Sequence, residues 1–351
     1  MELNINHSWG KIGDTTAKLF HIIDSNSGFS VDISDYGARL IRVLCDDREG
    51  VSSDINFGHF HPELYPTQGR TYGANIGRVA NRIGNGKFLL ENTEHQLFIN
   101  NAGKHTLHGG NEGFHFKFWH LFSSEVQDDI VRLTFQYFSP HGEESFPGNM
   151  TVFLTYEIRP NELLWKFTAT TDRPTLVNLT NHAYWNLESI NKTIDNHLLT
   201  LASTSYMPAD ETGLPTGEIL DTLDTDLDFT HPRKLSSIFS SHGDIDNYFF
   251  LDNSLSQKQS EELDNICVLY SPESGREMSV FTTEPGLQVY TGNAMNNYTV
   301  FGRTCQKHAA ICLETHDVPN AINFPLFEQN TVLYPNETYV HITKHKFKVK
   351  S

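Results

Sequence analysis

A single histidine, His182, lies among threonine, asparagine and aromatic residues in the segment PTLVNLTNHAYWNL (174–187). If residues 177–186 form a β-strand, their side chains alternate between the two faces of a sheet. One face then carries apolar side chains, namely Val177, Leu179, Ala183 and Trp185. The other face is polar and aromatic, as is typical of a sugar-binding surface rather than of a core, and it carries Asn178, Thr180, His182, Tyr184 and Asn186.

A carboxylate with a similar setting, Glu314, lies in the segment HAAICLETHDVPN (308–320). Alternation places it on one face with Ala310, Cys312 and His316, so it stands among small neighbours, as it would at the floor of a cleft. In the segment GLQVYTGN (286–293), Gln288 points away from the apolar face in the same way, together with Tyr290. A carboxylate and an imidazole in one cleft can exchange protons with a ligand at neutral pH.

Two loops add further polar groups. The segment TLHGG (106–110) places His108 before two glycines, which allow another part of the backbone to approach closely. The glycine-rich segment GRVANRIGNG (77–86) contributes Asn81 and Arg82. Each of these residues also has a purely structural explanation, because a lone histidine is often part of a core and a lone charge is often solvated.

Other kinds of chemistry find less support in the residue pattern. The 18 histidines are scattered, and no HExxH motif or joined cysteine and carboxylate cluster suggests a zinc site. The chain also lacks a GxSxG segment, a phosphate-binding P-loop and a dinucleotide fingerprint. Acid–base chemistry without a metal or another cofactor is therefore the favoured hypothesis.

The elements that must position these residues are predicted to be β-strands. Short runs such as VRLTFQYFS, MTVFLTYEI and LLWKFTATT alternate and are rich in β-branched and aromatic residues, with turn residues between them. Only HPELYPTQG (61–69) and HPRKLSSIF (231–239) suggest short helices. No linker or repeat divides the chain, so we expect one all-β domain over residues 1–351, built as a large antiparallel sandwich.

Composition limits the partners. The formal net charge of −17 argues against nucleic acid or an anionic membrane surface as a partner. No apolar run approaches the length of a membrane-spanning helix, and the N-terminal residues do not resemble a signal peptide. The four cysteines show no CxxC spacing, so we expect reduced thiols in a cytoplasmic protein. The oligomeric state is left open.

Seven segments together resemble the aldose 1-epimerase (galactose mutarotase) family, and they occur in the family's order over nearly the whole chain. They are GRVANRIGNGKF (77–88), LHGG with the following GF and FW (107–119), EESFPGNMTVFLTYEI (143–158), VNLTNHAYWNL (177–187), DIDNYFFL (244–251), GLQVYTGN (286–293) and ICLETHDVPNAIN (311–323). The resemblance implies an antiparallel β-supersandwich. It also implies interconversion of the α and β anomers of free hexoses such as galactose and glucose.

The resemblance further implies a role for each candidate residue. Glu314 corresponds to the catalytic base, His182 to the catalytic acid, and His108 to the second cleft histidine, near the ring oxygen of the sugar. The residues implied to contact the substrate are Arg82, Asp246 and Gln288 as hydroxyl ligands, and Asn81 and Tyr184 as lining residues. No cofactor is implied, and the expected partner is a small-molecule hexose.

The chain departs from the family pattern at three places. His316 stands where the family usually has glutamine, and Asn320 stands where it usually has aspartate. His115 and Phe116 replace an acidic residue and a lysine. Two alternative functions remain open: an epimerase of hexose 6-phosphates, which should need more cations, and a sugar-binding module without catalysis. We also expect a wet and polar cleft, in which the nearby carboxylates raise the pKa of His182.

Overall fold

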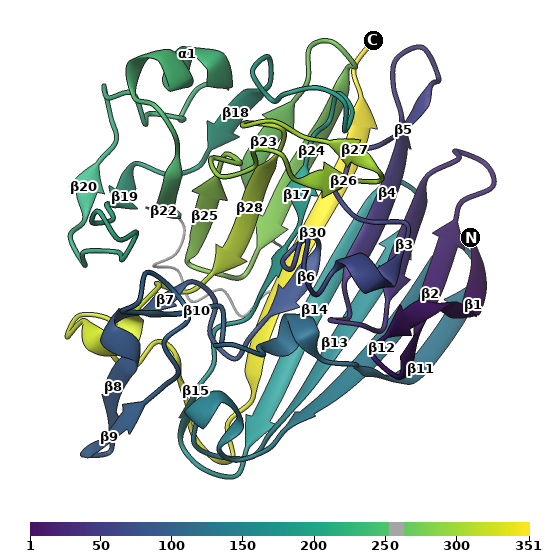
Figure 1. The fold of residues 1–351 in the computed structure, drawn as a ribbon. Coiled ribbons are helices and arrows are strands. Elements are labelled where there is room, and N and C mark those ends of the chain that lie inside the picture. Colours follow the sequence, from purple (N-terminus) through teal and green to yellow (C-terminus); the bar gives the residue numbers. More distant parts are fainter. Residues whose placement is uncertain (253–262) are drawn as a thin grey trace.

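The computed structural model describes residues 1–252 and 263–351, and antiparallel sheets dominate this part of the chain (Figure 1). The largest sheet of the described residues has nine strands and runs the length of the molecule. Its strands, in spatial order, are β11 (His120–Gln127), β12 (Ile130–Ser139), β13 (Met150–Arg159), β14 (Glu162–Thr171), β30 (Tyr339–Val349), β24 (Arg276–Thr282), β23 (Asn265–Tyr270), β18 (Leu198–Leu201) and β21 (Arg233–Lys234).

Two further sheets within the described residues cover this one. The first has six strands: β17 (Tyr184–Trp185), β28 (Ile311–His316), β25 (Gly286–Tyr290), β22 (Asp246–Phe250), β19 (Ser205–Met207) and β20 (Leu220–Asp221). The second has five strands: β1 (Glu2–Ile12), β2 (Thr15–Ile23), β3 (Ser30–Ser34), β4 (Leu40–Asp46) and β5 (Ser52–Asp54). The predicted all-β class and antiparallel sandwich are thus confirmed.

Alternation in the sequence explains which face of the large sheet is buried. In β13, Met150, Val152, Leu154, Tyr156 and Ile158 are buried, while the residues between them are partly exposed. Neighbouring strands pair in full register, so their apolar faces form one continuous surface. Burial of such a surface, at ~25 cal/mol per Å² of apolar area, is the main force that holds the sheets together.

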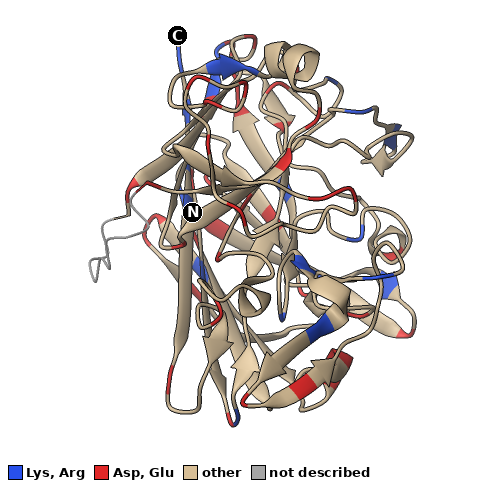
Figure 2. Ribbon diagram, turned by 90° about the vertical axis from the view of Figure 1, so that its left-hand side faces the viewer, with Lys and Arg blue, Asp and Glu red and all other residues tan. Residues whose placement is uncertain are grey.

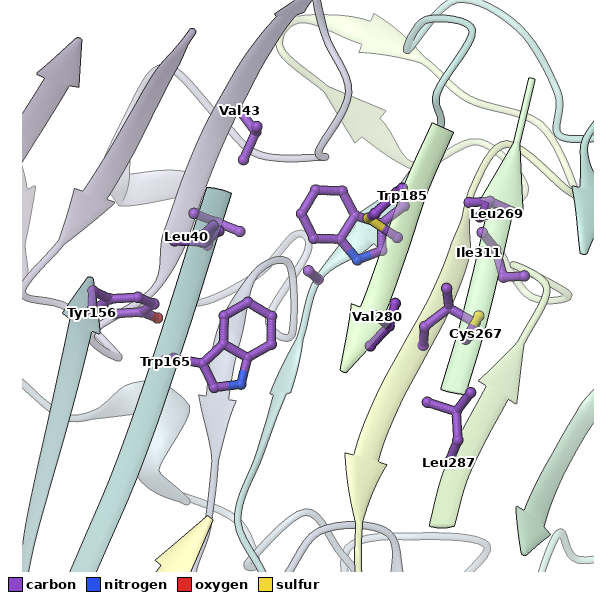
Figure 3. Packing of buried hydrophobic residues seen from close by; sticks show 14 of the residues in the cluster. Leu40, Val43, Tyr156, Trp165, Trp185, Cys267, Leu269, Val280, Leu287 and Ile311 are labelled. Atoms are coloured by element: carbon purple, nitrogen blue, oxygen red, sulfur yellow. The ribbon is translucent and has the colours of Figure 1, made fainter. Parts of the chain in front are cut away.

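The core between the sheets centres on two tryptophans (Figure 3). Trp165 of β14 and Trp185 of β17 are both almost fully buried. Figure 3 shows them between Leu40 of β4 on one side and Val280 of β24 on the other. The strands that carry the candidate residues are therefore attached to the large sheet through the heaviest side chains of the core.

The expected continuous strand over 177–186 is wrong in detail. The segment contains two short strands that pair with different partners: β16 (Thr180–His182) with β6 (Ala74–Ile76), and β17 with β28. Just before it, β15 (Thr175–Leu176) pairs with β29 (Val332–Leu333). Buried asparagines interrupt the segment, because their side chains take over backbone hydrogen bonds. Asn178, for example, lies before β16, donates from Nδ2 to the carbonyl of Asp317 and accepts at Oδ1 from the N–H of Asp317. The predicted alternation of faces nevertheless holds across the break.

Helices are few in the described residues. The two predicted segments contain a single 3₁₀ turn (Pro62–Leu64) and the short helix α1 (Leu235–Ser241). None of the described helices is long and apolar enough to cross a membrane. On the side shown in Figure 2, Lys and Arg lie singly or in short segments among Asp and Glu, in keeping with the negative net charge.

The core also contains a buried histidine with an unusual environment. His345 of β30 lies between Trp165 and Trp185, with ring centroids 4.6 Å and 5.2 Å away. Neither of its ring nitrogens has a hydrogen-bond partner among the described residues. Burial lowers the pKa of His345 to about 3, so the imidazole is neutral in the folded protein. Between about pH 3 and the ordinary histidine value of ~6.5, the unfolded chain therefore protonates this residue more readily than the folded protein does.

We expect His345→Phe to make folding less sensitive to acid. Since the folded pKa of about 3 lies below the ~6.5 of an unfolded histidine, the unfolded chain binds more protons between these values. Stability of the wild type is therefore lost as the pH falls through this window, by ~2 kcal/mol at about pH 5 from this group. Urea unfolding of both proteins at about pH 8 and pH 5 measures the difference. If the difference in free energy of unfolding between wild type and His345→Phe is the same at both pH values, the neutral state of His345 is contradicted.

Candidate active site

The centre of the site is a pair of residues on neighbouring strands. Gln288 of β25 lies directly opposite Glu314 of β28. Both side chains point to the face away from the main core, as their alternation with Leu287 and Leu313 predicts. Glu314 is 3 % exposed and Gln288 is 5 % exposed. The carboxylate is thus almost fully buried.

His182 meets Glu314 from the neighbouring segment. Its Nε2 lies 3.5 Å from Oε1 of Glu314. The Tyr184 ring, two residues further along, stacks on the imidazole with centroids 4.9 Å apart and planes inclined by 10°. The Tyr184 hydroxyl is 3.0 Å from Oγ1 of Thr71. These contacts leave the Nε2 edge of His182 directed at the carboxylate.

A loop contact holds the second histidine in one tautomer. The backbone N–H of Asn81 donates to Nδ1 of His108 (3.2 Å), and the backbone N–H of His108 donates to the carbonyl of Asn81 (3.0 Å). Burial lowers the pKa of His108 well below its usual value, so the ring is neutral and its proton lies on Nε2. The His108 and His182 rings are 5.2 Å apart. His108 therefore presents an N–H donor beside the pair formed by His182 and Glu314.

The close loop approach depends on glycine, as the sequence suggests. Gly109 has φ +83°, and a Cβ there would lie 1.9 Å from the carbonyl oxygen of Gly77. His108 itself has a left-handed φ of 51°, and so does Asn81 at 59°. Such conformations are costly for non-glycine residues and are concentrated at functional sites.

A chain of side-chain amides connects the remaining candidates. Asn81 donates from Nδ2 to Oε1 of Gln288 (3.1 Å), and Gln288 donates from Nε2 to Oδ1 of Asp246 (2.7 Å). Because each amide both donates and accepts, the chain fixes the orientation of Gln288. Burial raises the pKa of Asp246 and of Glu314, and the positive charge of Arg82 opposes the rise in both carboxylates. All eight predicted site residues thus lie together.

The expectation that the nearby carboxylates raise the pKa of His182 is wrong. Burial lowers the pKa of His182 to about 3. Burial, with a smaller contribution from Asp246, raises the pKa of Glu314 well above its usual range, and Arg82 opposes this only in part. In the sugar-free cleft, the pair therefore favours its uncharged form, with one proton on Glu314 and none on His182. The ion pair has the same number of protons, but the proton is on His182 and Glu314 is ionised.

Two residues that depart from the family pattern lie next to the site. Asn320 accepts a hydrogen bond at Oδ1 from the backbone N–H of Gly84 (2.9 Å), two residues after Arg82. An aspartate would accept the same bond, which explains why asparagine serves here. The sequence indicated the departure but not this link between the loop of Arg82 and the end of β28. His316 is 0 % exposed and lies two residues after Glu314.

A cavity of about 380 Å³ lies beside Tyr184. Sequence reasoning missed it, because its walls come from segments with no recognisable motif. Its lining residues are mostly aromatic or hydroxyl-bearing, and they are Thr67, Gly69, Arg70, Thr71, Tyr72, Tyr184, Tyr290, Ala294, Met295 and Tyr298. Tyr290 belongs to the same face of β25 as Gln288, so the cavity adjoins the row of catalytic candidates.

Comparison with known proteins identifies the family. The sequence profile of the aldose 1-epimerase family matches residues 20–346. The galactose mutarotases of Rattus norvegicus and Homo sapiens are each 36 % identical to the chain, and each alignment covers 91 % of both chains. The aldose 1-epimerase of Escherichia coli is 30 % identical over 92 % of this chain and 93 % of its own. The chain belongs to the aldose 1-epimerase family.

Solved structures agree on the fold. An aldose epimerase homologue from C. elegans superimposes with a TM-score of 0.84 and 26 % identity, over 95 % of this chain and all of its own. The galactose 1-epimerase of Lactobacillus acidophilus gives a TM-score of 0.85 at 23 % identity, over the full length of both chains. The class of protein is therefore an isomerase of the aldose 1-epimerase family, with the β-supersandwich fold of that family.

We expect kcat/KM to follow a bell-shaped pH profile whose acid limb lies below the ordinary histidine value of ~6.5. Activity requires one proton on the pair, and a second proton must enter His182, whose pKa burial lowers to about 3. The loss of the single proton, from the buried Glu314, sets the alkaline limb. Initial rates should be paired with assays after return to neutral pH, which separate titration from unfolding. An acid limb at or above ~6.5 would contradict this description.

We expect a metal chelator to leave the activity unchanged. Within the described residues, no group of three or more His, Cys, Asp or Glu side chains is placed to hold a metal ion. The test compares rates before and after dialysis against EDTA. Inhibition that added zinc reverses would show that a metal takes part.

Proposed function

We propose that the protein interconverts the α and β anomers of free hexoses, with Glu314 as the base and His182 as the acid. The observation that carries the proposal is the 3.5 Å separation of Nε2 of His182 from Oε1 of Glu314 in a nearly closed cleft. One acid and one base at this distance can act on two oxygens bonded to the same carbon. C1 of a pyranose carries two such oxygens, in its hydroxyl group and in the ring.

Ring opening uses the charged form of the pair. The Glu314 carboxylate takes the proton of the C1 hydroxyl, while protonated His182 gives its proton to the ring oxygen. The bond between C1 and the ring oxygen breaks, which leaves an aldehyde at C1 and a hydroxyl at C5. The pair is then uncharged, with its one proton on Glu314.

Ring closure uses the uncharged form, which burial already favours in the free protein. After rotation about the C1–C2 bond, neutral His182 takes the C5 hydroxyl proton as that oxygen attacks C1. Glu314 returns its proton to the former aldehyde oxygen. Atoms and charges balance over the cycle, and no electron or group leaves the sugar, so the mechanism needs no cofactor.

The other cleft residues would hold the sugar while C1 turns. His108 offers an N–H donor beside the ring oxygen, and Asp246 offers carboxylate oxygens to hydroxyl donors. The hydrogen-bonded chain from Asn81 through Gln288 keeps these groups in place before binding. Such preorganisation supports catalysis, because less order remains to be imposed on the reacting groups.

Free hexoses, with galactose and glucose first, are the proposed substrates. The galactose mutarotases among the relatives support this choice. Arg82 is the one arginine among the eight candidate residues, which favours an uncharged sugar over a sugar phosphate. We further propose that the protein acts in the cytoplasm, where the free and buried thiols of Cys45, Cys267, Cys305 and Cys312 stay reduced.

We expect the wild type to accelerate the optical-rotation change of fresh α-galactose, and Glu314→Gln to lose ~10²- to 10⁴-fold of that rate. The amide has nearly the same shape as the carboxyl group, but it cannot take the C1 proton. Polarimetry measures the rate, and isothermal titration measures whether the variant still binds galactose. Faster equilibration of glucose 6-phosphate than of glucose would favour the phosphate-specific alternative. Binding without any acceleration would favour a sugar-binding module.

The matched control is Glu284→Gln. Glu284 is also buried, and burial raises its pKa well above the usual range, but its carboxylate lies 3.8 Å from Nδ1 of His341 in the core. This variant should keep wild-type turnover. If Glu314→Gln keeps more than about a tenth of the wild-type activity, the loss is smaller than removal of a general base usually causes. That result would exclude Glu314 as the base.

A further inference from the structure

Two further buried residues, Thr180 and His316, lie next to the proposed catalytic pair of His182 and Glu314. The segment 178–185 runs beside β28 between two anchors. At one end Tyr184 pairs with Cys312. At the other end Asn178 donates from Nδ2 to the carbonyl of Asp317 (2.9 Å) and accepts at Oδ1 from the N–H of Asp317 (3.0 Å).

Between these anchors the segment 178–185 and β28 keep a constant register. His182 comes opposite Glu314, as their 3.5 Å contact shows. Continuing this register by two more residues on each segment sets Thr180 level with His316. Both residues point to the site face, because side chains two positions apart share a face, and both are 0 % exposed.

Thr180 and His316 each have a polar atom without a partner. Nδ1 of His316 is 2.6 Å from the carbonyl oxygen of Asp317, which only accepts hydrogen bonds. Nδ1 therefore carries the proton, and Nε2 of the neutral ring is an acceptor. Among the described residues neither Nε2 of His316 nor Oγ1 of Thr180 has a hydrogen-bond partner. An unsatisfied buried polar atom costs ~1–3 kcal/mol, and one ligand hydroxyl placed between these two atoms would satisfy both.

The imidazole of His316 is held firmly in place. Tyr248 of β22 stacks on it with centroids 5.4 Å apart, and the Tyr248 hydroxyl donates to the carbonyl of His316 (3.1 Å). Gly286 lies opposite His316 on β25, and a Cβ there would come within 1.9 Å of the Tyr248 hydroxyl oxygen. The absence of a side chain at Gly286 thus lets Tyr248 fix His316.

Electrostatics places His316 close to the reacting groups. A positive charge on His316 would lower the pKa of both His182 and His108. Burial lowers the pKa of His316 itself to about 4, so this charge is absent at neutral pH. The ring is therefore available there as a neutral acceptor.

We propose that His316 and Thr180 form a specificity-determining pair that binds one hydroxyl of the hexose beside the reacting end. That hydroxyl donates to Nε2 of His316 and accepts from the Thr180 hydroxyl, so the two atoms and the sugar group are complementary. A glutamine, usual in the family at this position, can either donate or accept, whereas this histidine only accepts. The proposal rests on the proposed function, since the ligand is its substrate.

The test combines deoxy sugars with variants that keep shape. Polarimetry gives kcat/KM for galactose and for its 2-, 4- and 6-deoxy analogues with the wild type, His316→Phe and Thr180→Val. In the wild type, one analogue should react at least ~10-fold less efficiently than galactose, because it leaves the pair unsatisfied. In each variant, galactose should lose ~10-fold, whereas that same analogue should change by less than ~3-fold.

Matched controls are His345→Phe and Thr222→Val. These residues are also fully buried with unpartnered polar atoms, but His345 lies in the core and Thr222 follows β20 at the far edge of the sheet. They should leave the ratio of galactose to every analogue unchanged. An equal loss for galactose and all analogues in the His316 and Thr180 variants would overturn the proposal in favour of a structural role.

A third variant keeps the test decisive if the apolar replacements do not fold. His316→Gln restores the usual family residue, and it should change the ratio of galactose to the sensitive analogue by more than ~3-fold, because the amide can also donate. A ratio within that factor would overturn the proposal. Absence of mutarotation of any free hexose by the wild type would instead refute the proposed function, so the two failures are distinguishable.

Discussion

The site depends on the register between the segment 178–185 and β28. His182 and Glu314 belong to different strand pairs, since β16 joins β6 whereas β28 joins β25 and β17. No continuous ladder holds them together. The 3.5 Å contact is instead fixed by the β17–β28 pairing on one side and by the Asn178 amide on the other. The large buried side chains around Trp185 then keep this segment packed against the large sheet (Figure 3).

The same burial that makes the contact rigid decides its electrostatics. In water, a carboxylate and an imidazole near neutral pH would be an ion pair, but desolvation makes two buried charges costly. Burial therefore favours the protonated form of Glu314, and the charge of Arg82 offsets only part of the cost of burying the carboxylate. A sugar bound in the cleft would bring hydroxyl groups that stabilise the charged form. The equilibrium between the charged and uncharged forms of the pair would then differ between the sugar complex and the free protein.

Sequence patterns predicted much of this arrangement. Period-two alternation correctly placed Gln288, Glu314, His182 and Tyr184 on polar faces, because a strand must put successive side chains on opposite sides. The loop residue His108 has no such periodicity, and only the glycine pair after it drew attention to it. Asp246 is the first residue of β22, and only the resemblance to a family indicated it. The pKa direction of His182 was mistaken, since alternation shows which face a residue is on but not how deeply that face is covered.

The anchoring of the segment 178–185 makes chain length its strictest requirement. Single replacements there change one contact, and neighbouring anchors still hold the rest. Loss or gain of one residue between Asn178 and Tyr184 would turn every intervening side chain to the opposite face, so that Ala183 or Asn181 would meet Glu314. Homologous genes that keep the activity should therefore vary in composition along this stretch yet never in its number of residues.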